Sequence, residues 1–222
     1  MYENVLANKQ YWERFLEQLK VDYGTPRFKA EVVFDTLLLP EIVVELVSKA
    51  LGKDSCEDFK FVVKEYPILN HRVDIGKANK RSFCIDYLLN SADKMYLVEL
   101  KTDKVSVKRE QLEKYRRLTE ASEFSETYRD YVEIVKGNKK RYAQQAQRVE
   151  AAQEKFRDEA EIIYIVPDEN AFLCKQGVKY ISLRAALADM KNYSSLTQTF
   201  LQIWQIATTA DASMDGFNQA IQ

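Results

Sequence analysis

The sequence predicts an α/β fold in which a mixed sheet is flanked by helices, and three observations lead to this prediction. Two apolar runs of strand length, at 82–89 and 95–101, are joined by a turn of hairpin length. An amphipathic segment at 139–160 leads into the continuous apolar run 161–167, which is typical of a strand buried on both faces. An antiparallel start followed by a helical crossover into a buried strand indicates a mixed sheet.

Helices are expected ahead of the sheet. Residues 2–20 carry apolar side chains at helical spacing with charges opposite, which predicts an amphipathic helix. The region 31–51 is also predicted to be helical, with Pro40 as an internal start or kink and Gly52 as the stop. The chain therefore begins with helical segments before its first strand.

Further elements frame the hairpin. The run 59–66 predicts a strand that is bounded by Pro67, and a second short strand is expected at 72–75. After the hairpin, a helix is predicted at 106–118, with Ser106 as a fair N-cap.

The end of the chain adds a strand and helices. A strand is predicted at 179–183, and helices are predicted within 184–207. The length of 222 residues suits one domain of generous size. We expect a single domain over 1–222, with a core at about 31–183 to which the helix 2–20 and the helices of 184–207 are additions.

Composition narrows the classes of function. The 33 Lys and Arg residues balance 34 Asp and Glu, so total charge argues neither for nor against nucleic acid. The three cysteines are widely spaced and form neither a metal-ligand pair nor a disulfide framework, which fits a reducing cytoplasm. No apolar stretch approaches the ~20 residues of a membrane span. His71 is the single histidine, which excludes sites that need two or three.

Charged residues occupy both strands of the predicted hairpin. Asp86 interrupts the first strand, and Glu99 and Lys101 interrupt the second. Such residues seldom lie in buried strands unless they are paired or bind a metal. Glu99 and Lys101 share one face because they are two residues apart. A cross-strand ion-pair ladder on a solvated face is the alternative, and the apolar flanks disfavour it.

These residues suit phosphodiester chemistry. Asp86 and Glu99 offer the carboxylate oxygens that Mg²⁺ or Mn²⁺ binds, and the backbone carbonyl of Leu100 is a further ligand. A bound metal lowers the pKa of a water, and Lys101 can orient that nucleophile. Gln111 and Tyr115 lie four apart on the predicted helix, so they share one face and can hydrogen-bond to the site.

A resemblance to a known family rests on Ile85-Asp86, Glu99-Leu100-Lys101 and Gln111-x-x-x-Tyr115. This series resembles the PD-(D/E)XK nuclease superfamily, and within it the branch with a Gln-x-x-x-Tyr helix that includes RecB-type nuclease domains. The resemblance covers the chain from 31 to 166. It implies a restriction-endonuclease-like core, with a central mixed sheet flanked by helices in αβββαβ order. It also implies a Mg²⁺- or Mn²⁺-dependent nuclease that hydrolyses phosphodiester bonds of DNA.

The family's site residues transfer onto this chain. Its metal-binding carboxylates correspond to Asp86 and Glu99, its lysine to Lys101, and its helix motif to Gln111 and Tyr115. The first motif is Ile-Asp where many members have Pro-Asp.

Many members of the family also carry an acid on the first core helix. Glu45 is the choice for that role, with Glu41 and Glu31 as alternatives, although its spacing also fits the exposed stripe of an amphipathic helix. Asp74 also resembles the first acid, but it lies 25 residues before Glu99, which is long for adjacent strands.

The expected partner is DNA. The basic segments 72–81, 101–117 and 136–141 can line a groove for phosphates. Of four tyrosines, three are expected to be core or sheet-packing residues, with stacking on unpaired bases as the alternative: Tyr66, Tyr87, Tyr96 and Tyr115. No phosphate-binding Gly-x-x-x-x-Gly-Lys motif occurs, so a helicase or other DNA-processing motor would be a separate subunit. Three cysteines cannot form the four-cysteine iron–sulfur site of some relatives.

Two rival functions remain open. One is a catalytically inactive member of the nuclease fold that binds DNA or serves as an interaction subunit. The other is an unrelated α/β binding module whose ion pairs are structural. In that second case, Asp86 and Glu99 would lie too far apart to share one ion.

Overall fold

The computed structural model describes residues 30–53, 56–69, 72, 82–102, 107–121, 123–137 and 139–205. The predicted helix 2–20 lies outside them, as does all of the predicted strand 72–75 except Arg72. Residues Val43–Ala185 form one compact unit, and the described residues outside it belong to another. The sheet and every element that contributes to the site described below lie within Val43–Ala185.

Two helices precede the sheet, as predicted. Helix α3 spans Ala30–Leu37, and α4 spans Pro40–Ala50, so the helix restarts at the proline. Gly52 follows α4 with a φ of 66°, the left-handed conformation that ends many helices. One face of α4 is buried and consists of aliphatic residues: Ile42, Val43, Leu46 and Val47.

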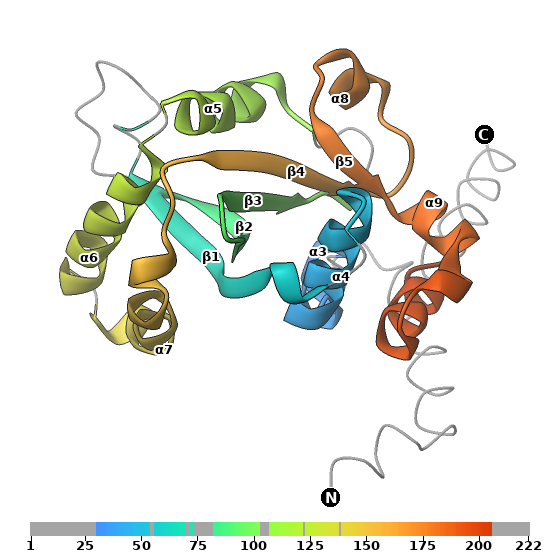
Figure 1. Cartoon of the computed structure of the whole chain (residues 1–222), viewed down its shortest axis with the longest axis horizontal. Coiled ribbons are helices and arrows are strands. Elements are labelled where there is room, and N and C mark those ends of the chain that lie inside the picture. The colour runs from blue at the N-terminus through green and yellow to red at the C-terminus, as the bar shows by residue number, and fades with distance from the viewer. Residues whose placement is uncertain are drawn as a thin grey trace, which may run out of the picture. The chain divides into compact units, whose positions relative to one another are not determined.

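The sheet has five strands in the order β1-β2-β3-β4-β5 (Figure 1). The strands are β1 (Lys60–Leu69), β2 (Ser82–Asn90), β3 (Met95–Leu100), β4 (Ala160–Val166) and β5 (Lys179–Ser182). Pairing is antiparallel from β1 to β3 and parallel from β3 to β5. The predicted mixed sheet flanked by helices is therefore confirmed, and all six residues of β3 are buried in its middle.

The first strand differs from its prediction. Pro67 was expected to end it, but β1 continues to Leu69 and pairs Pro67 with Cys84. The proline is tolerated because β1 is at the edge of the strand order, where a missing N–H need not break the sheet. Arg72 is not in a strand, contrary to the prediction for 72–75.

The crossover from β3 to β4 is more elaborate than predicted. Helix α5 (Arg109–Glu120) confirms the expected helix, although its N-cap is Lys108 and not Ser106. The structure adds a 3-10 turn η3 (Phe124–Glu126) and helix α6 (Thr127–Gly137), which the sequence analysis missed.

Helix α7 (Lys139–Ala151) ends earlier than the predicted limit at residue 160. A 3-10 turn, η4 (Gln153–Lys155), follows it. The helix cannot continue because Ala160 already pairs with Met95 at the start of β4. Phe156, in the segment between, is buried and stacks on Phe124.

The remaining elements follow β4. Helix α8 (Ala171–Lys175) was not predicted; it is short and is capped by Asn170, whose side chain accepts from Leu173 N. The predicted strand at 179–183 is confirmed as β5, and α9 (Leu183–Ala188) begins one residue ahead of the region 184–207 in which helices are predicted. A 3-10 turn, η5 (Met190–Asn192), follows, and another helix begins at residue 195.

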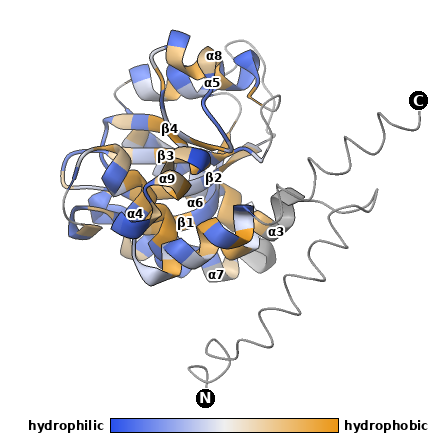
Figure 2. Ribbon diagram, turned by 90° about the vertical axis from the view of Figure 1, so that its right-hand side faces the viewer, coloured by the Kyte–Doolittle hydropathy of each residue, from blue (hydrophilic) through white to orange (hydrophobic). Residues whose placement is uncertain are grey.

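Helices α5, α6, α7 and α8 share one continuous hydrophobic core with the strands of the sheet. Figure 1 shows α5 and α8 on one side of the strands, with α6 and α7 beside β1. In Figure 2 these helices carry both hydrophilic and hydrophobic residues, as helices with one buried face do. Within the described part of the chain, no helix has the length and apolar character that crossing a membrane requires.

Candidate active site

The hairpin brings the two predicted carboxylates to the same end of its ladder. Tyr87 of β2 lies opposite Val98 of β3 as the last pair of that ladder, and Asp86 and Glu99 are the next residues on the two strands. Residues that face each other across antiparallel strands point to the same side of the sheet. Asp86 is also tied to β3, because its Oδ2 accepts a hydrogen bond of 2.8 Å from the Leu100 N–H.

Glu99 is a buried carboxylate with three donors. The residue is 3% exposed. Its Oε1 accepts from Lys101 Nζ at 2.7 Å and from Gln111 Nε2 at 2.6 Å, and its Oε2 accepts from the Tyr115 hydroxyl. A buried charge is tolerated only with such pairing. Four of the predicted residues thus meet at one carboxylate.

Helix α5 delivers two of those donors. Gln111 and Tyr115 lie one turn apart, and Gln111 Nε2 also lies 3.2 Å from the Tyr115 hydroxyl. Leu112 and Leu118 are buried in the core and hold this face of α5 on the sheet. On another side of the helix, the Arg116 guanidinium donates to the backbone carbonyl of Gln176 at 2.7 Å. The Gln-x-x-x-Tyr spacing thereby becomes a pair of donors aimed at Glu99.

Lys101 follows directly after β3, and its backbone is still hydrogen-bonded to the sheet. Its backbone N–H donates to the Ile165 carbonyl at 2.8 Å, which continues the parallel pairing with β4. Its ion pair with Glu99 confirms that the two side chains share one face, as strand alternation predicts. Leu100, between them, is 2% exposed and packs into the interior.

The charges of Asp86 and Glu99 raise the pKa of two buried tyrosines, Tyr115 and Tyr164. Burial, the charge of Glu99, its hydrogen bond and then the charge of Asp86 raise the pKa of Tyr115 far above its ordinary value. Burial, and then the charges of Glu99 and Asp86, likewise raise the pKa of Tyr164. Tyr115 therefore stays a neutral hydrogen-bond donor. The Glu99–Asp86–Lys101 group carries two negative charges and one positive charge, which favours a cation.

The carboxylate oxygens of Asp86 and Glu99 suit a hard divalent cation that is held by few protein ligands. Within the described ranges, no group of three or more His, Cys, Asp or Glu side chains could hold a metal ion. Mg²⁺ commonly takes only one or two carboxylates together with waters and substrate phosphate. Glu99 accepts three hydrogen bonds, and a carboxylate has about four acceptor positions, so room for a cation remains. Asp86 and Glu99 are the residues that would hold it, with the Leu100 carbonyl as a predicted third ligand.

The acid predicted for the first core helix lies on α4. Glu45 is half-buried on α4, and Glu41 is exposed at the start of that helix. The side chain of Glu31 and the whole of Asp74 lie outside the described residues. The role of Glu45 stays a prediction.

Sequence reasoning missed Tyr164. This tyrosine is fully buried on β4, where it lies beside Glu99 in the parallel register. Tyr164 could have been found by placing the run 161–167 beside 95–101 as a parallel neighbour in register. The apolar pattern alone does not give this register.

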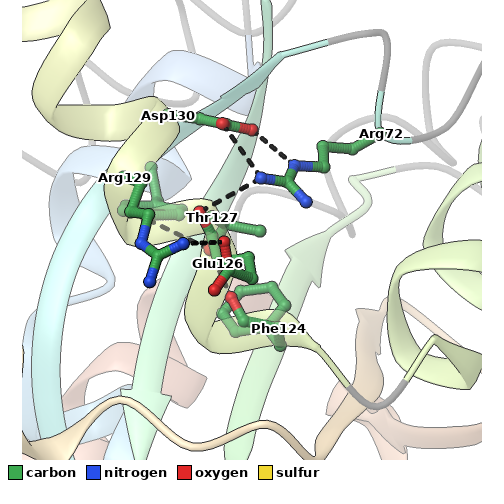
Figure 3. Close-up of polar contacts among 7 residues, drawn as sticks. Arg72, Phe124, Glu126, Thr127, Arg129 and Asp130 are labelled. Atoms are coloured by element: carbon green, nitrogen blue, oxygen red, sulfur yellow. Dashed lines mark hydrogen bonds and ion pairs between the residues drawn. The ribbon is translucent and has the colours of Figure 1, made fainter.

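Two arginines of the basic segments are held by contacts within the chain. The guanidinium of Arg72 donates to both carboxylate oxygens of Asp130 on α6, at 2.7 and 3.1 Å (Figure 3). Arg116 is bound to Gln176. The exposed cations of α5 and its N-cap are Lys108, Arg109 and Arg117. The rest of 72–81 lies outside the described residues.

The four tyrosines considered for base stacking are core residues: Tyr66, Tyr87, Tyr96 and Tyr115 are each 6% exposed or less.

No family model, curated protein or solved structure was found to match this chain.

Proposed function

We propose that the chain is a Mg²⁺- or Mn²⁺-dependent nuclease that hydrolyses phosphodiester bonds of DNA. The observation that carries this proposal is the convergence of Lys101, Gln111 and Tyr115 on the buried carboxylate of Glu99, beside Asp86. A solvated ion-pair ladder would not bury a carboxylate at 3% exposure under three donors from two elements. The predicted motif is thus one spatial unit.

Each side chain has a role in this chemistry. Asp86 and Glu99 would bind the cation, which supplies charge stabilisation and a lowered water pKa when bound. Lys101, 2.7 Å from Glu99, lies where it can hold the attacking water and offset phosphate charge. Gln111 and Tyr115 fix the orientation of Glu99, since both donate to its oxygens.

The order of elements supports a restriction-endonuclease-like core. Helix α4, strands β1 to β3, helix α5 and strand β4 follow in the αβββαβ order that the family resemblance implies. Helices α6 and α7 would be additions within the crossover, and β5 extends the sheet in parallel. In this proposal the site forms at the end of β3, where Lys101 leaves the sheet.

DNA would bind through phosphate contacts near α5. Lys108, Arg109 and Arg117 are exposed cations on the helix that also carries Gln111 and Tyr115. Lys and Arg side chains bind phosphates without reading sequence. A separate helicase or other DNA-processing subunit is the partner we propose for unwinding, if the substrate is duplex.

A cleavage screen tests the proposal. Purified protein is incubated with linear, circular and single-stranded DNA, with Mg²⁺, with Mn²⁺ and with a chelator. We expect cleavage that requires the metal and that disappears in Lys101→Ala. No cleavage of any substrate, together with no heat on titration with either metal, would overturn the proposal.

A second candidate is a non-catalytic DNA-binding or interaction subunit. It is favoured by the fact that Glu99 already accepts three hydrogen bonds from donors of the chain itself. In that case, Lys101→Ala would lower stability without any activity to lose. Tight DNA binding without cleavage by the wild-type protein would establish this candidate over the first.

A further inference from the structure

Tyr164 lies against the candidate site on the side away from the hairpin. It faces Glu99 in the parallel register of β3 and β4. Its ring meets the ring of Tyr115 edge to face, with centroids 6.4 Å apart and planes at 75°. Tyr164 itself is 0% exposed. A rigid aromatic side chain is thus fixed next to the donor that orients Glu99.

The hydroxyl of Tyr164 is buried without a hydrogen-bond partner among the residues that the structure describes. A buried hydroxyl without a partner is unfavourable, and phenylalanine would fill the same space without this cost. The pKa of Tyr164 is raised first by burial and then by the charges of Glu99 and Asp86. The hydroxyl therefore stays protonated and lies in the field of both carboxylates while bonding to neither.

We propose that Tyr164 is a positioning residue whose hydroxyl binds a water of the hydrated cation held by Asp86 and Glu99. This inference rests on the proposed function for its cation. Mg²⁺ gives up its waters reluctantly, so a site with two carboxylates must also hold several of them. A tyrosine hydroxyl both donates and accepts, which suits a water in either orientation. The described residues supply no partner for this hydroxyl, and the hydrated cation would bring one.

Tyr131 offers a matched control. Its hydroxyl is also buried without a described partner, and the residue is 1% exposed. Its pKa is raised to about 12 by burial and by Glu150, Tyr142 and Tyr128, and neither site carboxylate contributes. Tyr131 thus shares the burial of Tyr164 and differs in its distance from the site.

The test compares Tyr164→Phe with Tyr131→Phe in the full chain. Urea unfolding is measured without metal, Mg²⁺ and Mn²⁺ affinity by calorimetric titration, and DNA cleavage by kcat and KM. We expect both variants to be at least as stable as the wild type without metal. Tyr164→Phe alone should weaken metal binding about tenfold, the value of one hydrogen bond, and should lower kcat with little change in KM for DNA.

Equal metal affinity in Tyr164→Phe and the wild type would overturn the inference. So would a marked loss of metal-free stability in Tyr164→Phe, because the hydroxyl would then have a structural partner. If the wild type binds metal but cuts no DNA, the proposed nuclease function fails, while weaker metal binding by Tyr164→Phe would still support the role of its hydroxyl. If the wild type binds no metal, both fail.

Discussion

Glu99 is a charged residue of which only 3% is exposed to solvent. Its three donors come from the end of β3 and from α5. Removal of one donor leaves a buried charge short of a partner, which costs more than a surface hydrogen bond. The site and the stability of the fold are therefore linked at this residue.

Tyr115→Phe should lower the free energy of unfolding by about 1 to 3 kcal/mol, since it removes one donor from the buried carboxylate. Cleavage should fall about 10- to 100-fold, as is typical when a group that orients a metal ligand is lost. Urea unfolding and single-turnover cleavage measure the two effects. Tyr128→Phe is the control, because its hydroxyl bonds to Gln153 on the surface. Equal stability of the two variants would contradict this account.

At the scale of single residues, the sequence predicts the site where the signal is local. Glu99 with Lys101, and Gln111 with Tyr115, are recognised by spacing along one strand or one helix. Asp86 follows from the register of a short hairpin. Tyr164 cannot be predicted in this way, because its position beside Glu99 depends on the parallel pairing of β3 with β4, which are separated by the whole crossover.

The elements around the sheet are held by specific polar contacts as well as by the core. Arg72 is joined to α6 through both oxygens of Asp130, and it also approaches the Glu126 carbonyl at 3.4 Å. The Arg72 side chain is 26% exposed and that of Asp130 only 10%. This ion pair ties the chain after β1 to α6.

A double-mutant cycle on Arg72→Ala and Asp130→Ala should give a coupling of about 1 to 2 kcal/mol in unfolding free energy. The same cycle on Arg129 and Glu126 should give a value close to zero, because the Arg129 side chain is 78% exposed. Affinity for DNA should not change in Arg72→Ala, since this guanidinium already binds Asp130. Strict additivity of the Arg72 and Asp130 substitutions would contradict a structural role for the pair.

Elements with aliphatic periodicity are predicted well from the sequence. The hairpin and β4 lie within one or two residues of their predicted limits. Helix α6 was missed because its buried positions are Thr127, Asp130 and Tyr131, which do not form an aliphatic stripe. The end of α7 was misplaced because the stripe continues through Phe156, which is buried after the helix has ended.

The whole molecule has an interior rich in tyrosine. The largest fully buried side chains of the described residues include five tyrosines: Tyr66, Tyr87, Tyr115, Tyr131 and Tyr164. Burial is the first cause that raises the pKa of four of them, Tyr66, Tyr115, Tyr131 and Tyr164. These four hydroxyls remain neutral in the folded protein at pH values where an unfolded chain ionises.

Stability should therefore fall steeply in alkali. The folded pKa values lie above the unfolded value near 10, so this contribution is fully present below about pH 9 and is lost as pH rises. Four such groups lower the free energy of unfolding by about 5 kcal/mol per pH unit above roughly pH 10. Urea unfolding from pH 8 to 11 measures the slope, and absorbance at 295 nm reports tyrosine ionisation. Complete ionisation of the 13 tyrosines in the folded protein would contradict this account.

The central claim is that Asp86 and Glu99 share one cation for DNA cleavage, and Asp86→Asn tests it most directly. The asparagine oxygen can still accept from the Leu100 N–H, so the fold is kept while the charge is lost. The measurement is the cleavage rate as a function of Mg²⁺ concentration for the wild type and for Asp86→Asn. We predict metal-dependent cleavage by the wild type and a loss of about 100-fold or more in the variant, with a higher Mg²⁺ requirement. Equal rates and equal Mg²⁺ dependence in the two proteins, or wild-type cleavage in the presence of a chelator, would contradict the claim.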